Sequence, residues 1–101
     1  MIYEIAEIEV KQGSEKEFEA AVAQASACFA DAKGCRSLNL QRSIERPTCY
    51  RLVVGWNCVD DHMVTFRESE GFQQWRRLAG PHFAQPPKVE HVDTVYYGFS
   101  Q

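Results

Sequence analysis

A chain of 101 residues with a formal net charge of -3 is large enough for one domain, residues 1–101, and too small for two ordinary ones. Hydrophobic residues make up 45% of it and aromatic residues 12%, which is typical of a globular domain and argues against disorder. No basic run is longer than Arg76-Arg77, so we expect no nucleic acid and no anionic membrane as partner. No apolar run approaches the roughly 20 residues that cross a bilayer.

The four cysteines show neither a C-x-x-C pair nor a zinc-type Cys/His spacing; they are Cys28, Cys35, Cys49 and Cys58. The opening stretch MIYEIAEIEV alternates apolar and acidic residues, which is not the pattern of a signal peptide. Since a reducing compartment keeps thiols free, we expect a cytoplasmic protein without disulfides.

The first 34 residues predict a strand followed by a helix. Residues 2–10 alternate with period two, as in a strand. Ser14 and Glu17 have the spacing of a capping box at a helix start, and Lys33-Gly34 marks the helix end. Between them, apolar residues recur at helical spacing and form one stripe: Phe18, Ala21, Val22, Ala25, Cys28 and Phe29.

Two further strands are predicted at 35–44 and 49–56, joined by the turn 45–48. Asn57 is then the expected N-cap of a helix whose buried side carries Val59, His62, Met63 and Phe66. Ser69 restarts the helix, and Gly80-Pro81 ends it. A last strand is predicted over 88–97, with one side formed by Val89, His91, Asp93, Val95 and Tyr97.

This order, β-α-β-β-α-β, predicts a ferredoxin-like α+β fold: a four-stranded antiparallel sheet with both helices on one face. We expect the last strand to lie beside the second, at an edge of the sheet. Every strand carries apolar residues on both sides, so the face without helices also needs cover. A homodimer in which two sheets pack face to face would provide it.

Two stretches resemble a known family. The segment from Glu7-Ile8 to Ala20 and the stretch VGWNCVDDHMVTFRESEGFQQWR together resemble the antibiotic biosynthesis monooxygenase domain family of the dimeric α+β barrel superfamily, over nearly the whole chain. The superfamily includes cofactor-free oxygenases of polyketide phenols, quinol monooxygenases, haem-degrading enzymes and small proteins of no known activity. The resemblance implies a dimeric barrel.

The chain departs from two branches of that superfamily. Ala6, Phe66 and Arg76 stand where the haem-degrading branch uses Asn, Trp and His, so the resemblance does not imply haem degradation. The quinol-monooxygenase branch often shows a histidine near the place of Phe66, whereas this chain has His62 four residues earlier.

His62 and His91 are the candidate catalytic residues. His62 is predicted on the inner side of a helix and titrates near neutrality, so it could take a phenolic proton as base or pass it on, with His91 as its partner. The alternative is a core histidine bound to a backbone carbonyl or to Asp93. A metal site would need a third ligand, His82 or Asp93, and no metal is predicted.

Aromatic side chains are the candidate substrate-binding residues. Trp56 and Tyr50 are expected to form a stacking wall, to which Phe66 and Trp75 would add. Arg76 is the candidate to hold an anionic or phenolate oxygen. The alternatives are core positions for the aromatic residues and a solvated helix end for Arg76.

The function that the resemblance implies is a cofactor-independent monooxygenase acting on a small aromatic, phenolic or quinol-like molecule. A base would remove the phenolic proton, and the anion would react with O₂. No glycine-rich nucleotide fingerprint is present, so neither flavin nor nicotinamide is expected. The alternative hypotheses are a non-catalytic small-molecule-binding or stress-associated dimer of the same fold, and a structural protein whose pocket is filled by Met63, Phe66 and Trp75.

Overall fold

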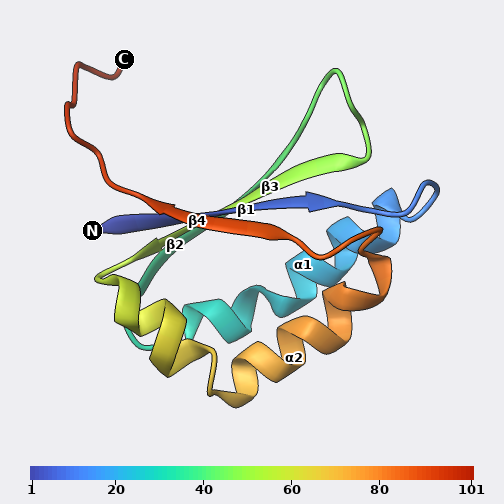
Figure 1. Ribbon diagram of the computed structural model, residues 1–101, viewed down its shortest axis with the longest axis horizontal. Helices are drawn as coiled ribbons and strands as arrows, with labels where there is room; N and C mark the ends of the chain where they lie inside the picture. Colours follow the sequence, from blue (N-terminus) through green and yellow to red (C-terminus); the bar gives the residue numbers. More distant parts are fainter.

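One antiparallel sheet, in the strand order β2-β3-β1-β4, is the centre of the computed structural model, which describes residues 1–101 (Figure 1). Its strands are β1 (Ile2–Glu9), β2 (Cys35–Arg42), β3 (Cys49–Trp56) and β4 (Lys88–Val92). The sequence prediction of an α+β, ferredoxin-like fold is confirmed.

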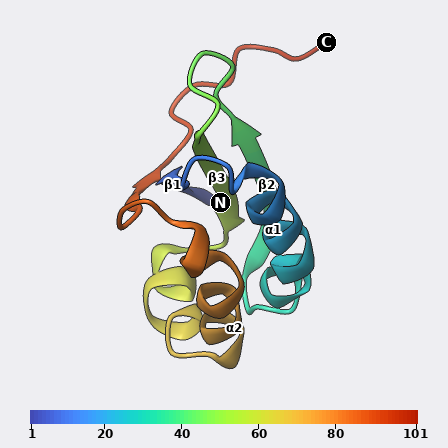
Figure 2. The same cartoon turned by 90° about the vertical axis from the view of Figure 1, so that its right-hand side faces the viewer.

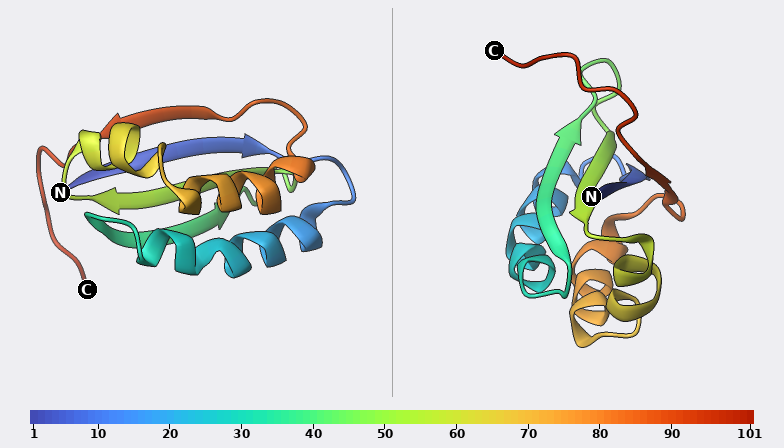
Figure 3. Two further views of the ribbon diagram at one scale, coloured as in Figure 1. Left: turned by 90° about the horizontal axis from the view of Figure 1, so that it is seen from below. Right: turned by 90° about the vertical axis from the view of Figure 1, so that its left-hand side faces the viewer.

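The helices all lie on one face of this sheet (Figures 2 and 3). They are α1 (Glu15–Ala30), the π-helix η1 (Asp61–Phe66), α2 (Glu70–Ala79) and the 3₁₀ turn η2 (Gly80–His82). The predicted apolar stripe of α1 is buried except for Cys28, which is half-buried. No helix combines the length and the apolar character that a membrane-spanning segment needs.

The expected position of the last strand beside the second is wrong. β4 pairs with β1, and β2 pairs with β3. Each β-α-β unit leaves a gap one strand wide between its two parallel strands; β3 enters the first gap and β1 the second. The predicted strand 88–97 is also too long, because Val92 already pairs with Tyr3, next to the first residue of β1, and no strand continues beyond it.

The helix predicted from Asn57 differs in its start and its type. Asn57 does not cap it, since its Oδ1 accepts a hydrogen bond from Arg36 Nε at 2.8 Å. In η1 the Arg67 N–H donates to the carbonyl of His62, five residues earlier, at 3.2 Å, which is the spacing of a π-helix.

The wider turn of η1 changes which residues are buried. His62 and Phe66 point inward, as predicted, whereas Val59 and Met63 are exposed by 40% and 36%. The predicted inner stripe is therefore half right. Two of its residues contribute to the core, and the other two face solvent.

The side of the sheet that faces the helices holds the core. Along β3 every second residue is buried on this side: Tyr50, Leu52, Val54 and Trp56. The opposite side has no helix over it (Figure 1). Its centre is apolar, because Tyr3, Ile5 and Val53 are half-buried there and Val92 is 41% exposed.

Candidate functional site

Glu4 is an acidic residue that lies among three of the candidate site residues, Trp56, His62 and His91. Glu4 pairs with His91 of β4 on one side and with Val54 of β3 on the other. It shares its face with the buried Ala6 and Ile8, so its side chain points toward the helices, where it is only 5% exposed. The carboxylate therefore lies inside the apolar layer rather than in solvent.

Polar contacts join this carboxylate to both histidines. Trp56 Nε1 donates a hydrogen bond to Glu4 Oε1 at 3.1 Å. His62 Nε2 lies 3.3 Å from the same oxygen, and His62 Nδ1 lies 2.9 Å from His91 Nε2. We call this arrangement the Glu4–His62–His91 chain. His62 is bound neither to a backbone carbonyl nor to Asp93, the two partners of the alternative interpretation.

Burial shifts Glu4 and His62 toward their neutral forms. The pKa of Glu4 is raised to about 7, chiefly because the buried carboxylate loses its water; the Trp56 N–H and the Arg67 charge act against this. The pKa of His62 is lowered to about 4 by the same loss of water, with further contributions from His91 and Arg67. At neutral pH His62 is therefore an uncharged imidazole beside a carboxyl group close to half-ionised.

Two arrangements of protons provide a donor and an acceptor at each contact of the Glu4–His62–His91 chain. With Glu4 protonated, its hydroxyl faces His62 Nε2, and the His62 Nδ1–H donates to His91 Nε2. With Glu4 ionised, the His62 Nε2–H faces the carboxylate, and the His91 Nε2–H donates to His62 Nδ1. The two arrangements differ by one proton, which is exchanged at the other ring nitrogen of His91.

Aromatic rings hold the imidazole of His62 in place. The Trp56 ring stacks on it with a centroid distance of 5.3 Å and an interplanar angle of 20°. Phe66 lies 5.3 Å from Trp56 and 6.5 Å from His62. The His62 ring is thus fixed by one stacked ring, one tilted ring and two polar contacts.

A glycine anchors the start of the helix that carries His62. Gly34, after α1, has φ +78°, and a side chain there would collide with the Asp61 carboxylate. This close approach buries Asp61, and it sets η1 against the α1-β2 connection.

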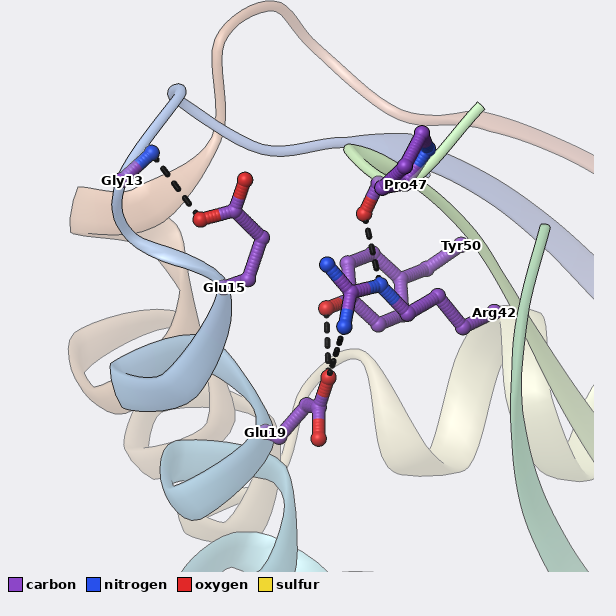
Figure 4. Close-up of polar contacts among 6 residues, drawn as sticks. All are labelled: Gly13, Glu15, Glu19, Arg42, Pro47 and Tyr50. Carbon is purple, nitrogen blue, oxygen red and sulfur yellow. Dashed lines mark hydrogen bonds and ion pairs between the residues drawn. The ribbon is translucent and has the colours of Figure 1, made fainter. Parts of the chain in front are cut away.

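The structure brings together four of the predicted site residues: His62, His91, Trp56 and Phe66. It separates the other three from them. Tyr50 lies six residues from Trp56 on β3, where its hydroxyl donates to Glu19 at 2.6 Å below the Arg42 guanidinium (Figure 4), so the stacking wall of Trp56 and Tyr50 is wrong.

Trp75 and Arg76 also lie apart from the histidine pair. The Trp75 ring packs on Phe29 and Phe83, at centroid distances of 5.3 and 6.4 Å, within the core. Arg76 is exposed, with its guanidinium 5.9 Å from the Phe72 ring centre. No three His, Cys, Asp or Glu side chains form a group that could hold a metal ion.

Glu4 is the site residue that sequence reasoning missed. Its signal was an acidic residue on the same strand face as Ile2, Ala6 and Ile8, and such a residue must be paired or protonated once that face is buried. Alternation alone places Glu4 on that face, but the sequence does not identify its partners on η1, β3 and β4.

Two hollows lie elsewhere on the molecule. One, of about 380 Å³, lies at the opposite end of β1 and is rich in charge, with Arg46, Arg51 and Lys88 near Glu7 and Glu9. The other, of about 640 Å³, lies between α1 and the η1-α2 segment, with Phe66 among its lining residues. Neither is lined by a histidine; His91, on the edge strand, is half-buried, whereas His62 is only 3% exposed.

Comparisons with known proteins agree with one another. The family model described as antibiotic biosynthesis monooxygenase matches residues 1–78. The uncharacterised protein YczJ of Bacillus subtilis (strain 168) is 35% identical over 95 residues, which span 94% of this chain and 100% of YczJ.

Solved structures give the same result. A Bordetella bronchiseptica protein assigned to the antibiotic biosynthesis monooxygenases is 54% identical, with a TM-score of 0.93 over 94% of this chain and 97% of that one. A variant of SnoaB, a cofactor-independent oxygenase from Streptomyces nogalater, has a TM-score of 0.80 at 18% identity over 95% of this chain and 94% of its own. At that identity the likeness shows a shared fold alone.

Proposed function

Because the chain belongs to the antibiotic biosynthesis monooxygenase family, we propose that it is a cofactor-independent monooxygenase that oxidises a small phenolic or quinol-like aromatic molecule with O₂. The observation that carries the proposal is the hydrogen-bonded pair of His62 and His91, stacked on Trp56. An imidazole pair held in a fixed orientation, with His62 uncharged, is suited to take a hydroxyl proton at neutral pH.

The substrate hydroxyl binds at His91. His62 is only 3% exposed and both its ring nitrogens face protein groups, so a substrate cannot reach it directly. His91 is half-buried on the edge strand, and its Nδ1 makes no hydrogen bond within the chain. In this scheme His91 takes the proton and His62 passes it inward.

The oxidation then needs only the substrate anion and O₂. Removal of the hydroxyl proton leaves a carbanion-like ring carbon, which gives electrons to O₂ and forms a C–O bond. The resulting peroxide anion takes a proton from His91. Loss of the remaining C–H proton and cleavage of the O–O bond then leave a carbonyl at the ring carbon. The hydrogens of the substrate's O–H and ring C–H leave with the second oxygen atom of O₂ as water.

A second copy of this chain is the proposed partner. The face of the sheet opposite the helices is apolar at its centre, around Ile5 and Val53. The β2-β3 hairpin and the C-terminal segment rise beyond this face at its two ends (Figure 1). Ile44 in the hairpin is 91% exposed, and Val95 and Phe99 in the C-terminal segment are 95% and 79% exposed, so both features offer apolar surface for a homodimer.

The test is oxygen uptake in the presence of a panel of hydroquinones, naphthols and anthrones. We expect one class to support uptake, and His62→Ala to slow it by about 100-fold or more, the usual effect of losing general acid–base catalysis. His82→Ala is the matched control, since His82 lies on η2, away from the site.

Two results would contradict the proposal: no member of the panel supports uptake, or His62→Ala is as active as His82→Ala. Binding of a panel member without any turnover would instead support the non-catalytic small-molecule-binding dimer.

A further inference from the structure

We propose that Glu4 is a positioning residue that stores the substrate's proton, so that a proton taken up at His91 ends on the buried carboxylate of β1. This inference rests on the proposed function, because it assigns the final proton acceptor of the same site.

The geometry that supports this role is a continuous line of groups from the sheet edge to the interior. His91 Nε2 and His62 Nδ1 are 2.9 Å apart, and His62 Nε2 and Glu4 Oε1 are 3.3 Å apart. The second distance is long for a hydrogen bond, as is common at catalytic groups without substrate. Exposure falls along the line, from half-buried His91 to Glu4 at 5%.

The transfer balances with three proton movements. The substrate O–H bond breaks and its proton joins His91 Nδ1. The proton on His91 Nε2 moves to His62 Nδ1, and the proton on His62 Nε2 moves to Glu4 Oε1. The products are the substrate anion, two neutral imidazoles in the exchanged tautomer, and a neutral carboxylic acid. The reverse sequence returns the proton to the peroxide.

A proton store is useful here because a charged group between the sheet and the helices is largely removed from water, which costs free energy. Without Glu4, the accepted proton would remain as an imidazolium in a mostly apolar setting, where burial already lowers the pKa of His62 to about 4. With Glu4, the transfer neutralises a buried carboxylate instead of creating a buried cation. The only charge left is the substrate anion, which is the species that reacts with O₂.

Several groups face the Glu4 carboxyl and influence its pKa. Trp56 donates to it, His62 contacts it, and the positive charge of Arg67 favours its ionised form. Cys35 is the other titratable neighbour, and the Glu4 charge helps to raise the pKa of its thiol. Burial outweighs the Trp56 and Arg67 effects and brings the pKa of Glu4 to about 7, so the carboxylate is available as acceptor above neutral pH.

The kinetic test uses Glu4→Gln, whose amide oxygen can still accept from Trp56. We expect kcat to fall by about tenfold or more with little change in KM, since Glu4 does not touch the substrate. We also expect the rise of kcat with pH near 7 to disappear. Glu17→Gln is the matched control, on the exposed side of α1, away from both the site and the uncovered face of the sheet.

A second readout does not depend on turnover. In a proton NMR titration we expect the ring resonances of His62 to shift with a midpoint near pH 7 in the wild-type chain and in Glu17→Gln, and to lose that step in Glu4→Gln. If oxygen uptake is absent from every variant but this step depends on Glu4, the oxidation is refuted and the proton store stands. If Glu4→Gln keeps the wild-type kcat and pH profile, or leaves the His62 step in place, the proton store is refuted.

Discussion

Glu4 and His62 have pKa values displaced in opposite directions by the same loss of water. Glu4 rises from 4.5 to about 7, so between these values the folded chain keeps a proton that the unfolded chain releases, and stability falls as pH rises. His62 falls from 6.5 to about 4, so the unfolded chain binds a proton that the folded chain refuses, and stability rises with pH. Between about pH 4.5 and 6.5 the two contributions cancel.

Replacing either Glu4 or His62 should reveal the contribution of the other to the pH dependence of stability. In Glu4→Gln the free energy of unfolding should fall on acidification from pH 6.5 toward 4, by up to about 1.4 kcal/mol per pH unit. In His62→Gln it should instead fall as pH rises from 4.5 to 7. Urea unfolding at pH 5 and 6.5 measures both slopes relative to wild type. Identical slopes in all three proteins would show that the two groups are not linked in this way.

At the scale of elements, two serines expected to begin helices behave differently. Ser69 has an extended backbone, and its Oγ accepts a hydrogen bond from the Phe72 N–H at 3.2 Å and donates one to the Phe66 carbonyl at 2.6 Å. It therefore joins η1 to α2. Ser14 has φ -94° and ψ 4°, and its side chain makes no capping bond, so the predicted capping box is wrong. Instead, Glu15 accepts from the Gly13 N–H at 2.9 Å.

Replacing each serine by alanine tests this difference. Ser69→Ala should lower the free energy of unfolding by about 1 kcal/mol, the usual cost of losing an N-cap, whereas Ser14→Ala should cost less than about half of that. Urea denaturation at fixed pH provides the comparison. Equal losses would mean that the Ser69 hydrogen bonds add nothing to the stability of α2.

For the whole molecule, the uncovered side of the sheet determines how copies would associate. A charge placed in the centre of a face that is buried between two sheets has to be desolvated, which strongly disfavours the dimer. Light scattering should therefore give twice the chain mass for the wild type and a single chain mass for Val53→Glu. Val64→Glu, on the helical layer with Val64 already 49% exposed, should remain dimeric. A monomeric wild type, or a dimeric Val53→Glu, would rule out this interface.

The chain's own patterns were sufficient for the order of the elements and for the direction of some of the side chains. The residue pattern predicted β1 and β3 as strands, and helical spacing predicted the buried side of α1. The inward position of His62 also followed from local spacing. These features depend on contacts between residues a few positions apart, so the sequence by itself determined them.

The tertiary structure alone decided how the site is assembled. The Glu4–His62–His91 chain joins β1, η1 and β4, and which residues meet depends on the register of β4 against β1 and on the π-helical turn of η1. Tyr50 and Trp56, predicted to lie together, are separated because they occupy opposite ends of one rigid strand. Register is set by the packing of the entire sheet against the helices, because a shift of one residue would turn every side chain to the other face.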